Sequence, residues 1–447
     1  MWALSLIRRG DGCPYLTIVQ TNTVPFSTMT DPHCYLESLS PELLLPILTH
    51  LPDLDSLDSL LRASPAAYRV FDTQSATIFK TVLSSGSTHI YTCALIRIIA
   101  LIRANALPPT VHNLVDFKDL VRHETSPHRW RPSRWDHPPS SWPSDLPKII
   151  VRELLTTNRK VQRLTFGCLE YYLDQFKSLR PFHSAEFSFD STYCAEVAAD
   201  CIGPWQDKPV GTVYYYPVQD VGPPSWLEEQ RIIRAFWRIQ LSRDVNAAVD
   251  AASIVWPEEE GLAHLNGMSP ADFCDVPSFF NDKKRGKPVE FREMSRIETI
   301  LEHELLDSAI EYTQKVKEVI SESTYWQLKK NWAAGSVPKS EEDWETLDLM
   351  WRSNMWDYFS NLTGSRWTHE FNFRSPLQHA KFEPWRRYGF AIWSTARMAG
   401  YGLLLPRGEY PSGLEKPYYE AWRNLLTEDV REAVDKENKR WDAELGL

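Results

Sequence analysis

Residues 39–71 read LSPELLLPILTHLPDLDSLDSLLRASPAAYRVF, and this stretch decides the fold we expect for the N-terminal part of the chain. It contains three helix starts in close succession, at Ser40, Asp53 and Ser64. A small polar side chain at an N-cap accepts a hydrogen bond from the first helical turn, and a proline placed directly after it already has a helical φ angle. We therefore predict three short helices, one after another.

The apolar residues of these segments gather on one face of each predicted helix. Helices this short expose more leucine than they can hide from one another, so the unit needs a partner, either another chain or the rest of this one. The residues assigned to these faces are Leu43, Leu44, Ile47, Leu48 and Leu51 in the first helix, Leu54, Leu57, Leu60 and Leu61 in the second, and Ala67, Tyr68 and Phe71 in the third.

In this order and at this spacing, the residues resemble the F-box, the short helical module that docks onto the Skp-type adaptor subunit of SCF (Skp–cullin–F-box) ubiquitin ligases. The matching residues are Leu39, Glu42, Leu43, Leu44, Ile47, Leu48 and Leu51. Two residues depart from the pattern: Ser40 replaces the usual proline, although Pro41 stands beside it, and Pro46 lies inside the first helix, where we expect a kink. The phrases SPAAYRVF and AFWRIQL are also similar to fungal F-box proteins with long helical C-terminal regions.

The resemblance implies that this protein is a substrate-recognition adaptor of such a ligase. Its C-terminal region would hold a target protein, and the other subunits would carry out the ubiquitination. The residues implied to bind the Skp-type subunit are Leu39, Pro41, Glu42, Leu43, Leu44, Ile47, Leu48, Leu51, Leu54 and Leu57.

Two other interpretations stay open. The protein could be a non-catalytic scaffold or regulator whose F-box-like helices belong to its own core, or an enzyme without a recognisable linear motif. The adaptor needs the face of Leu43, Leu44 and Ile47 to be reachable, whereas the scaffold needs the C-terminal region to cover it. The enzyme needs a deep pocket with converging polar groups and perturbed titrations.

Linear motifs of known chemistry are missing from the sequence. It contains no phosphate-binding loop, HExxH pair, nucleophile elbow, glycine-rich dinucleotide pattern or EF-hand loop. Its seven cysteines form no CxxC pair. We therefore expect no catalytic residue, no cofactor and no metal site, and a chain that is not an enzyme.

The composition is typical of a soluble globular protein, with 43% hydrophobic and 24% charged residues. The 49 Lys and Arg against 59 Asp and Glu give a net charge of −10, which argues against general nucleic-acid binding through phosphates. The longest apolar run, residues 90–102, is interrupted by Arg97 and is too short to span a bilayer, so we expect no membrane partner. Free cysteines and an N-terminus unlike a signal peptide favour a cytoplasmic or nuclear location, or both.

At 447 residues the chain is long enough for two or three domains, or for one large core with an appended module. We predict a mainly α protein, in which a small N-terminal three-helix F-box-like module is followed by a large irregular α-helical domain. The predicted parts are a loose leader (1–34), the module (35–86), a helical connector (87–123), a linker rich in proline and tryptophan (124–148) and the helical C-terminal domain (149–447).

Hydrophobic periodicity predicts further helices along the chain. The tryptophans of the linker and of the C-terminal domain either cover the neighbouring core or, as the alternative, form binding sites for a partner. Residues 211–219 contain Pro217 and are expected to form an edge strand or a covering loop. One of these predicted helices begins at Ser75. The others cover residues 90–104, 148–155, 161–179, 226–253, 294–332, 342–361 and 414–445, and the segment 294–332 has the clearest pattern.

Overall fold

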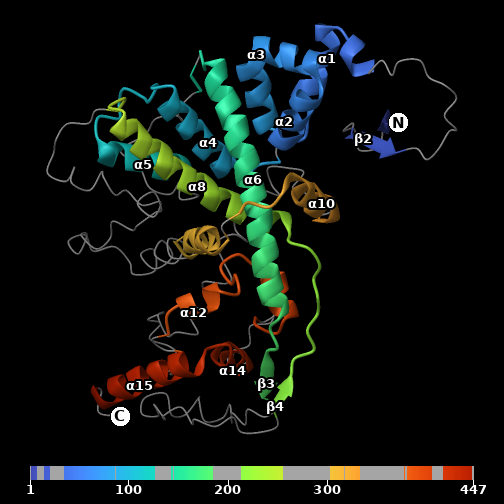
Figure 1. Ribbon diagram of the computed structural model, residues 1–447. Coiled ribbons are helices and arrows are strands. Elements are labelled where there is room, and N and C mark those ends of the chain that lie inside the picture. Colours follow the sequence, from blue (N-terminus) through green and yellow to red (C-terminus); the bar gives the residue numbers. More distant parts are fainter. Residues whose placement is uncertain are drawn as a thin grey trace, which may run out of the picture.

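A computed structural model shows that the protein is mainly α-helical, as predicted (Figure 1). In Figure 1 helix α6 (Lys148–Lys177) runs from the N-terminal helices at one end of the molecule to the C-terminal helices at the other. Its 30 residues correspond to a length of about 45 Å. The structure describes residues 2–7, 15–20, 35–85, 87–125, 142–143, 145–184, 213–254, 303–316, 318–332, 377, 380–404 and 416–444.

The N-terminal helices begin where the caps predict them. Asp53 accepts a hydrogen bond from the backbone N–H of Ser56 at 2.7 Å, and Ser64 accepts one from Ala67 at 3.1 Å. The fourth helix, expected from Ser75, is joined to the third across a kink at Gln74, whose φ is −133°. The elements are a 3₁₀ turn η1 (Tyr35–Ser38) and helices α1 (Pro41–Thr49), α2 (Leu54–Ala63) and α3 (Pro65–Leu83).

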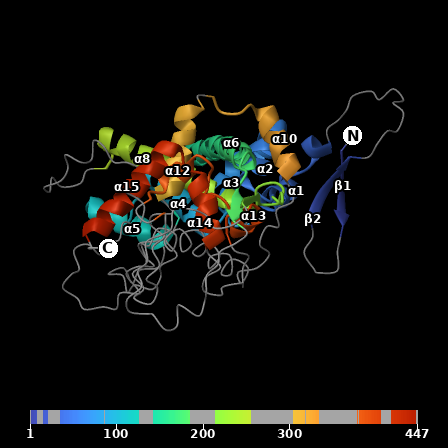
Figure 2. The ribbon, with the colours of Figure 1, turned by 90° about the horizontal axis from the view of Figure 1, so that it is seen from below.

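Part of the expected leader forms a hairpin. Strand β1 (Trp2–Ile7) pairs antiparallel with β2 (Tyr15–Gln20), with Trp2 opposite Gln20 and Ile7 opposite Tyr15. The hairpin stands beside the helices in both Figure 1 and Figure 2. The expectation of a loose leader did not include this hairpin.

Helix α6 is continuous where the sequence pattern predicts two helices. The polar residues 156–160 separate the two predicted helices, but they contain no glycine or proline. Thr156 and Thr157 donate to the carbonyls of Arg152 and Glu153 at 3.0 and 2.8 Å, and Asn158 is buried against α2. These side chains meet the backbone or another helix, so the polar stretch does not end the helix.

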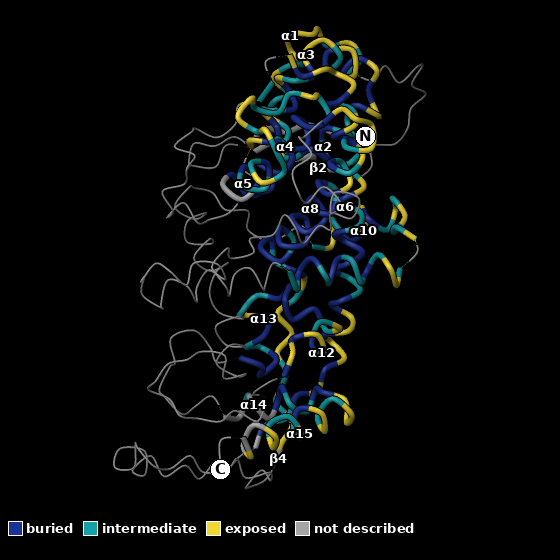
Figure 3. Tube along the Cα trace, turned by 90° about the vertical axis from the view of Figure 1, so that its left-hand side faces the viewer, coloured by how far each residue is buried: buried dark blue, intermediate teal, exposed yellow. Residues whose placement is uncertain are grey.

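The centre of the molecule is built from α4 (Ile90–Arg103), α6 and α8 (Trp226–Asp250). Helix α4 is buried on nearly every side, as its uniformly apolar sequence predicts, and α5 (Leu114–Thr125) lies against it. Figure 3 shows buried residues along α6 and α8 and many exposed ones at the α1 and α3 end. Within the described part of the chain, no helix is both long and apolar enough to cross a membrane.

The end of the linker covers the core of the N-terminal helices. The Trp142 ring meets Phe79 edge-on at a centroid distance of 6.0 Å. Lys80 lies 5.7 Å above the Trp142 ring and donates to the Pro143 carbonyl at 3.2 Å. The covering role is confirmed for Trp142; the other two linker tryptophans and the predicted helix 342–361 lie outside the described residues.

The long helix predicted for residues 294–332 is interrupted. Residues 303–315 are helical, and α10 (Glu322–Trp332) follows after a break. β-branched Val316, Val319 and Ile320 lie in or beside this break, and such residues lower helix propensity. Ser321 then accepts a hydrogen bond from the Thr324 N–H at 3.1 Å and starts α10. A single helix was therefore the wrong prediction; residues 294–302 lie outside the described part.

The C-terminal region packs around three fully buried tryptophans, Trp385, Trp393 and Trp422. Each indole N–H donates to a backbone carbonyl, at 3.0, 2.7 and 2.8 Å respectively. The core interpretation is confirmed for these three. The elements here are the antiparallel pair β3 (Phe182–Ser184) and β4 (Val213–Tyr215) and the helices α12 (Glu383–Arg386), α13 (Thr395–Gly400), α14 (Lys416–Asn424) and α15 (Glu428–Glu444). Helices α14 and α15 lie where the sequence predicts a single helix, residues 414–445.

Two adjacent alanines at the end of α8 should respond oppositely to glycine. Ala252 has a φ of 52°, which suits glycine, whereas Ala251 has a φ of −80°. Ala252→Gly should raise the free energy of unfolding by about 1 kcal/mol because a Cβ is unfavourable in the left-handed region. Ala251→Gly, the matched control, should lower it. Thermal melting of the two variants checks this, and a loss of stability in both would contradict it.

Candidate functional site

The ten residues expected to bind the Skp-type subunit lie in three environments. Leu39, Ile47 and Leu51 are half-buried. Four others, Leu44, Leu48, Leu54 and Leu57, are buried in the core, and three are exposed, namely Pro41, Glu42 and Leu43. The expected single docking surface is therefore divided between the inside and the outside of the molecule.

Helix α1 has two different apolar sides. Leu44 and Leu48 are spaced by four residues and point inward, in a helix that packs on α3. Leu43 and Ile47 have the same spacing one position earlier, and Leu43 is 58% exposed. The expectation that all these residues share one face was wrong, because neighbours in a helix are about 100° apart around its axis. We call Pro41, Glu42, Leu43 and Ile47 the outer face of α1.

The start of α1 differs in detail from the expected cap. Ser40 occupies the N-cap position, but its side chain makes no capping hydrogen bond to the backbone. It bonds the Glu42 side chain instead, and this bond lowers the pKa of Glu42. The helix continues through Pro46, where a kink was expected, and extends from Pro41 to Thr49. Exposed Glu42 and Pro46 lie on the solvent side of this turn.

The 3₁₀ turn η1 is tied to the start of α3. The Glu37 carboxylate accepts a hydrogen bond from the Ser64 hydroxyl and another from the Ala66 N–H at 3.0 Å. This carboxylate lies at the positive end of α3, where the helix dipole favours it. The contact holds the chain that enters α1, and it leaves Tyr35 exposed at the same end of the molecule.

The polar side of α2 is covered by other helices of the same chain. Asp55 is 5% exposed, and its carboxylate accepts hydrogen bonds from Asn158 of α6 at 3.1 Å and from the Tyr325 hydroxyl of α10. Lys329 of α10 lies 3.0 Å from Asp55 and 3.2 Å from Asp53. A buried carboxylate is tolerated only when such donors replace water, so these contacts fix α2 against α6 and α10.

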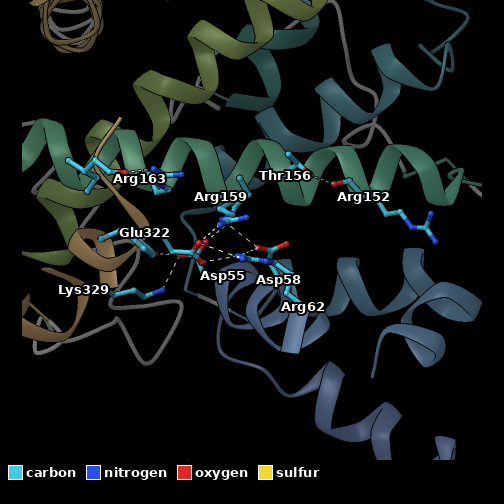
Figure 4. A network of polar contacts seen from close by, with 12 residues as sticks. Asp55, Asp58, Arg62, Arg152, Thr156, Arg159, Arg163, Glu322 and Lys329 are labelled. Atoms are coloured by element: carbon cyan, nitrogen blue, oxygen red, sulfur yellow. Dashed lines mark hydrogen bonds and ion pairs between the residues drawn. The ribbon is translucent and has the colours of Figure 1, made fainter. Parts of the chain in front are cut away.

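A second group of charges surrounds this cluster nearer the surface. Figure 4 shows Arg62 of α2 and Arg159 of α6 converging on Glu322 of α10. The distances are 2.8 Å from Arg62 and 2.5 Å from Arg159, and both arginines also lie 3.9 Å from Asp58. These pairs are partly open to solvent, so salt screens them more than the Asp55 contacts.

Burial and the excess of carboxylates perturb the titration of this cluster. Burial alone would lower the pKa of Lys329, but Asp55 and Asp53 raise it above its usual range. Burial raises the pKa of Glu229, on α8, to about 7; Lys329 opposes this shift, while Asp55 and Asp53 add to it. The pKa of Glu229 therefore lies near neutral pH, within reach of the charges of Lys329, Asp55 and Asp53.

The polar cluster encloses little space. The cavity lined by Asp58, Arg159, Arg163 and Trp326, among others, has a volume of about 10 Å³. This is room for roughly one water molecule. Within the described ranges, no group of three or more His, Cys, Asp or Glu side chains could hold a metal ion. The arrangement holds helices α2, α6 and α10 closely together.

Sequence reasoning missed this cluster. In the sequence, Asp55 is a polar residue close to the predicted helix start at Asp53, and its partner Tyr325 lies 270 residues further along the chain. No local pattern connects two such positions.

Searches against protein-family models, curated proteins and solved structures find no match to this chain.

Two aspartates of α2 should differ sharply in their effect on stability. Asp55→Asn removes the charge partner of half-buried Lys329 and a carboxylate oxygen that accepts from the buried Tyr325 hydroxyl; leaving a buried donor without its acceptor costs about 1–3 kcal/mol. Asp58→Asn, the matched control, removes only ion pairs at 3.9 Å, worth about 1 kcal/mol or less. Thermal melting should show a much larger loss for Asp55→Asn; equal losses would contradict the assigned roles.

Glu229 should make the protein less stable as the pH rises. Its folded pKa of about 7 lies above the ordinary value of 4.5, so the folded state holds the proton more tightly. This contribution is fully present below pH 4.5 and is lost as the pH rises through 7. Glu229→Gln cannot ionise, so at pH 8 its free energy of unfolding should exceed that of the unmodified protein by at most about 3 kcal/mol, and its melting temperature should be higher. The difference should shrink at pH 5, and a gain that is independent of pH would contradict this.

Proposed function

We propose that this protein is a substrate-recognition adaptor of an SCF-type ubiquitin ligase. The outer face of α1 binds the Skp-type subunit, and the C-terminal helical region holds a protein target. The observation that supports this most is the position of Leu43, which is 58% exposed on a helix whose opposite side is anchored in the core. Pro41, Glu42 and Ile47 are the other exposed or half-buried members of this set on α1, and they follow the order that resembles the F-box.

The energetics favour a partner for this face. Burying one leucine or isoleucine side chain contributes about 1.5–3 kcal/mol, and this gain is largely unused in exposed Leu43. A nanomolar complex needs about 12 kcal/mol in total. Leu43 therefore supplies at most about a quarter of such a binding free energy. Ile47 and the exposed Tyr35 are nearby in the chain.

The buried leucines have a supporting role in this proposal. Leu44 and Leu48 hold α1 on α3, and Leu54 and Leu57 hold α2 in the core. They position the outer face without touching the partner. Half-buried Leu39 and Leu51 also pack against the core. The docking residues are therefore Pro41, Glu42, Leu43 and Ile47, fewer than the resemblance alone implies.

One observation favours the scaffold as a second candidate. The inner leucines of α1 and α2 belong to the same continuous core as residues of α6, α8 and the C-terminal helices. A protein that only uses these helices to complete its own core needs the same arrangement. The two candidates differ at Leu43, because the scaffold gives this exposed side chain no task.

Leu43→Asp should abolish binding to the Skp-type subunit while the protein stays folded. It removes an apolar contact and places an unpaired carboxylate in an apolar interface, which together cost several kcal/mol. Val115→Asp is the matched control, since Val115 is also an exposed apolar residue, 66% exposed on α5. Binding is measured by titration calorimetry with purified Skp-type subunit.

Leu44→Asp reports on folding rather than docking. Leu44 is 1% exposed, so a carboxylate there should lower the melting temperature strongly or cause aggregation. Failure of the unmodified protein to bind the Skp-type subunit would contradict the adaptor proposal. Unchanged binding of folded Leu43→Asp would contradict the role of the outer face.

A further inference from the structure

Helix α10 is attached to the molecule through a small apolar contact. Its buried residues Tyr325 and Leu328 form a cluster with Phe166 of α6 that is separate from the main core. The rings of Tyr325 and Trp332 lie 5.0 and 5.2 Å from the Phe166 ring. Because this cluster is small, polar contacts supply much of what places α10.

The polar contacts of α10 come from one side of the helix. Glu322, Tyr325 and Lys329 are spaced by three and four residues and therefore share a face. Glu322 lies between two arginines of α2 and α6, whereas Tyr325 and Lys329 both meet Asp55. In addition, Arg163 of α6 donates to the Ile320 carbonyl just before the helix, at 2.8 Å from Nε.

We propose that the surface beneath α10, formed by Asp55, Arg62, Arg159, Arg163 and Phe166, is an exchangeable helix-binding site whose resident occupant is α10. The partner it fits is an amphipathic helix with an acidic residue, a tyrosine three positions later and a lysine four positions after that. α10 itself shows that such a helix meets Asp55, Arg62 and Arg159, while Arg163 is met by the Ile320 carbonyl just before the helix.

Two features make exchange physically reasonable. An incoming helix of this pattern restores the contacts of Asp55, Arg62 and Arg159, and a backbone carbonyl just before it can accept from Arg163 as that of Ile320 does, so the buried Asp55 carboxylate does not stay unpaired after the exchange. The contacts of Glu322 with Arg62 and Arg159 are also partly open to water and are therefore individually weak. Exchange can thus begin at the Glu322 end and proceed towards Lys329.

The same charges give the site its specificity. An acidic side chain fits beside Arg62 and Arg159, and a cationic one fits beside Asp55. A helix with the opposite order brings like charges together at both ends, which disfavours binding. The pattern therefore sets the direction of the bound helix as well as its composition.

A peptide with the sequence of residues 318–332, labelled with fluorescein, tests the proposal by fluorescence anisotropy. It is titrated into the full chain and into Lys329→Gln and Glu322→Gln variants, which weaken the resident helix but leave the site intact. Peptide affinity should be at least about tenfold higher for the variants, because apparent affinity follows the fraction of protein whose site is open. A control peptide carrying Lys329→Gln should bind both variants more weakly.

A second measurement needs no variant of the protein. Excess peptide added to the unmodified chain should speed hydrogen exchange in α10 and leave α6 protected. The proposal is overturned if folded variants, checked by circular dichroism, bind the peptide no better than the unmodified chain, or if excess peptide leaves α10 exchange unchanged. The site excludes α1, so either result stands independently of Skp binding.

Discussion

The buried carboxylate of Asp55 is the constraint on which the arrangement of the helices depends. Its donors come from two different helices, Asn158 from α6 and both Tyr325 and Lys329 from α10. Sliding α2 along α6 would leave this charge without compensation in a poorly solvated place. The position of α3, which packs on both α2 and α6, and that of α1, which packs on α3, follow from this joint.

A rigidly placed α1 has consequences for recognition. Its inner side is anchored by Leu44 and Leu48, so the outer face is presented without first ordering a flexible segment. A preorganised surface loses less conformational entropy on binding and gains affinity without added contacts. The C-terminal helices, which pack around buried tryptophans, lie at the far end of α6, about 45 Å away along the helix. In the adaptor proposal this separation keeps the target away from the docking face.

Local structure was largely predictable from the sequence, whereas long-range structure was not. Caps such as Asp53 and Ser64 act through residues three positions away, and they marked the starts of α2 and α3 correctly. The continuity of α6 was missed because buried Asn158 is stabilised by Asp55, 103 residues earlier in the chain. For the candidate site, the leucine pattern located α1 but could not tell its inner side from its outer side. That distinction depends on where α3 lies, which periodicity alone does not contain.

Hydrogen exchange of the full chain, with and without purified Skp-type subunit, tests the central claim most directly. The account predicts that the partner slows exchange across α1 and η1. It also predicts little change in α2, whose polar side is already covered by α6 and α10. Absence of any protection in α1, or protection that appears in α2 and α10 instead, would contradict the account.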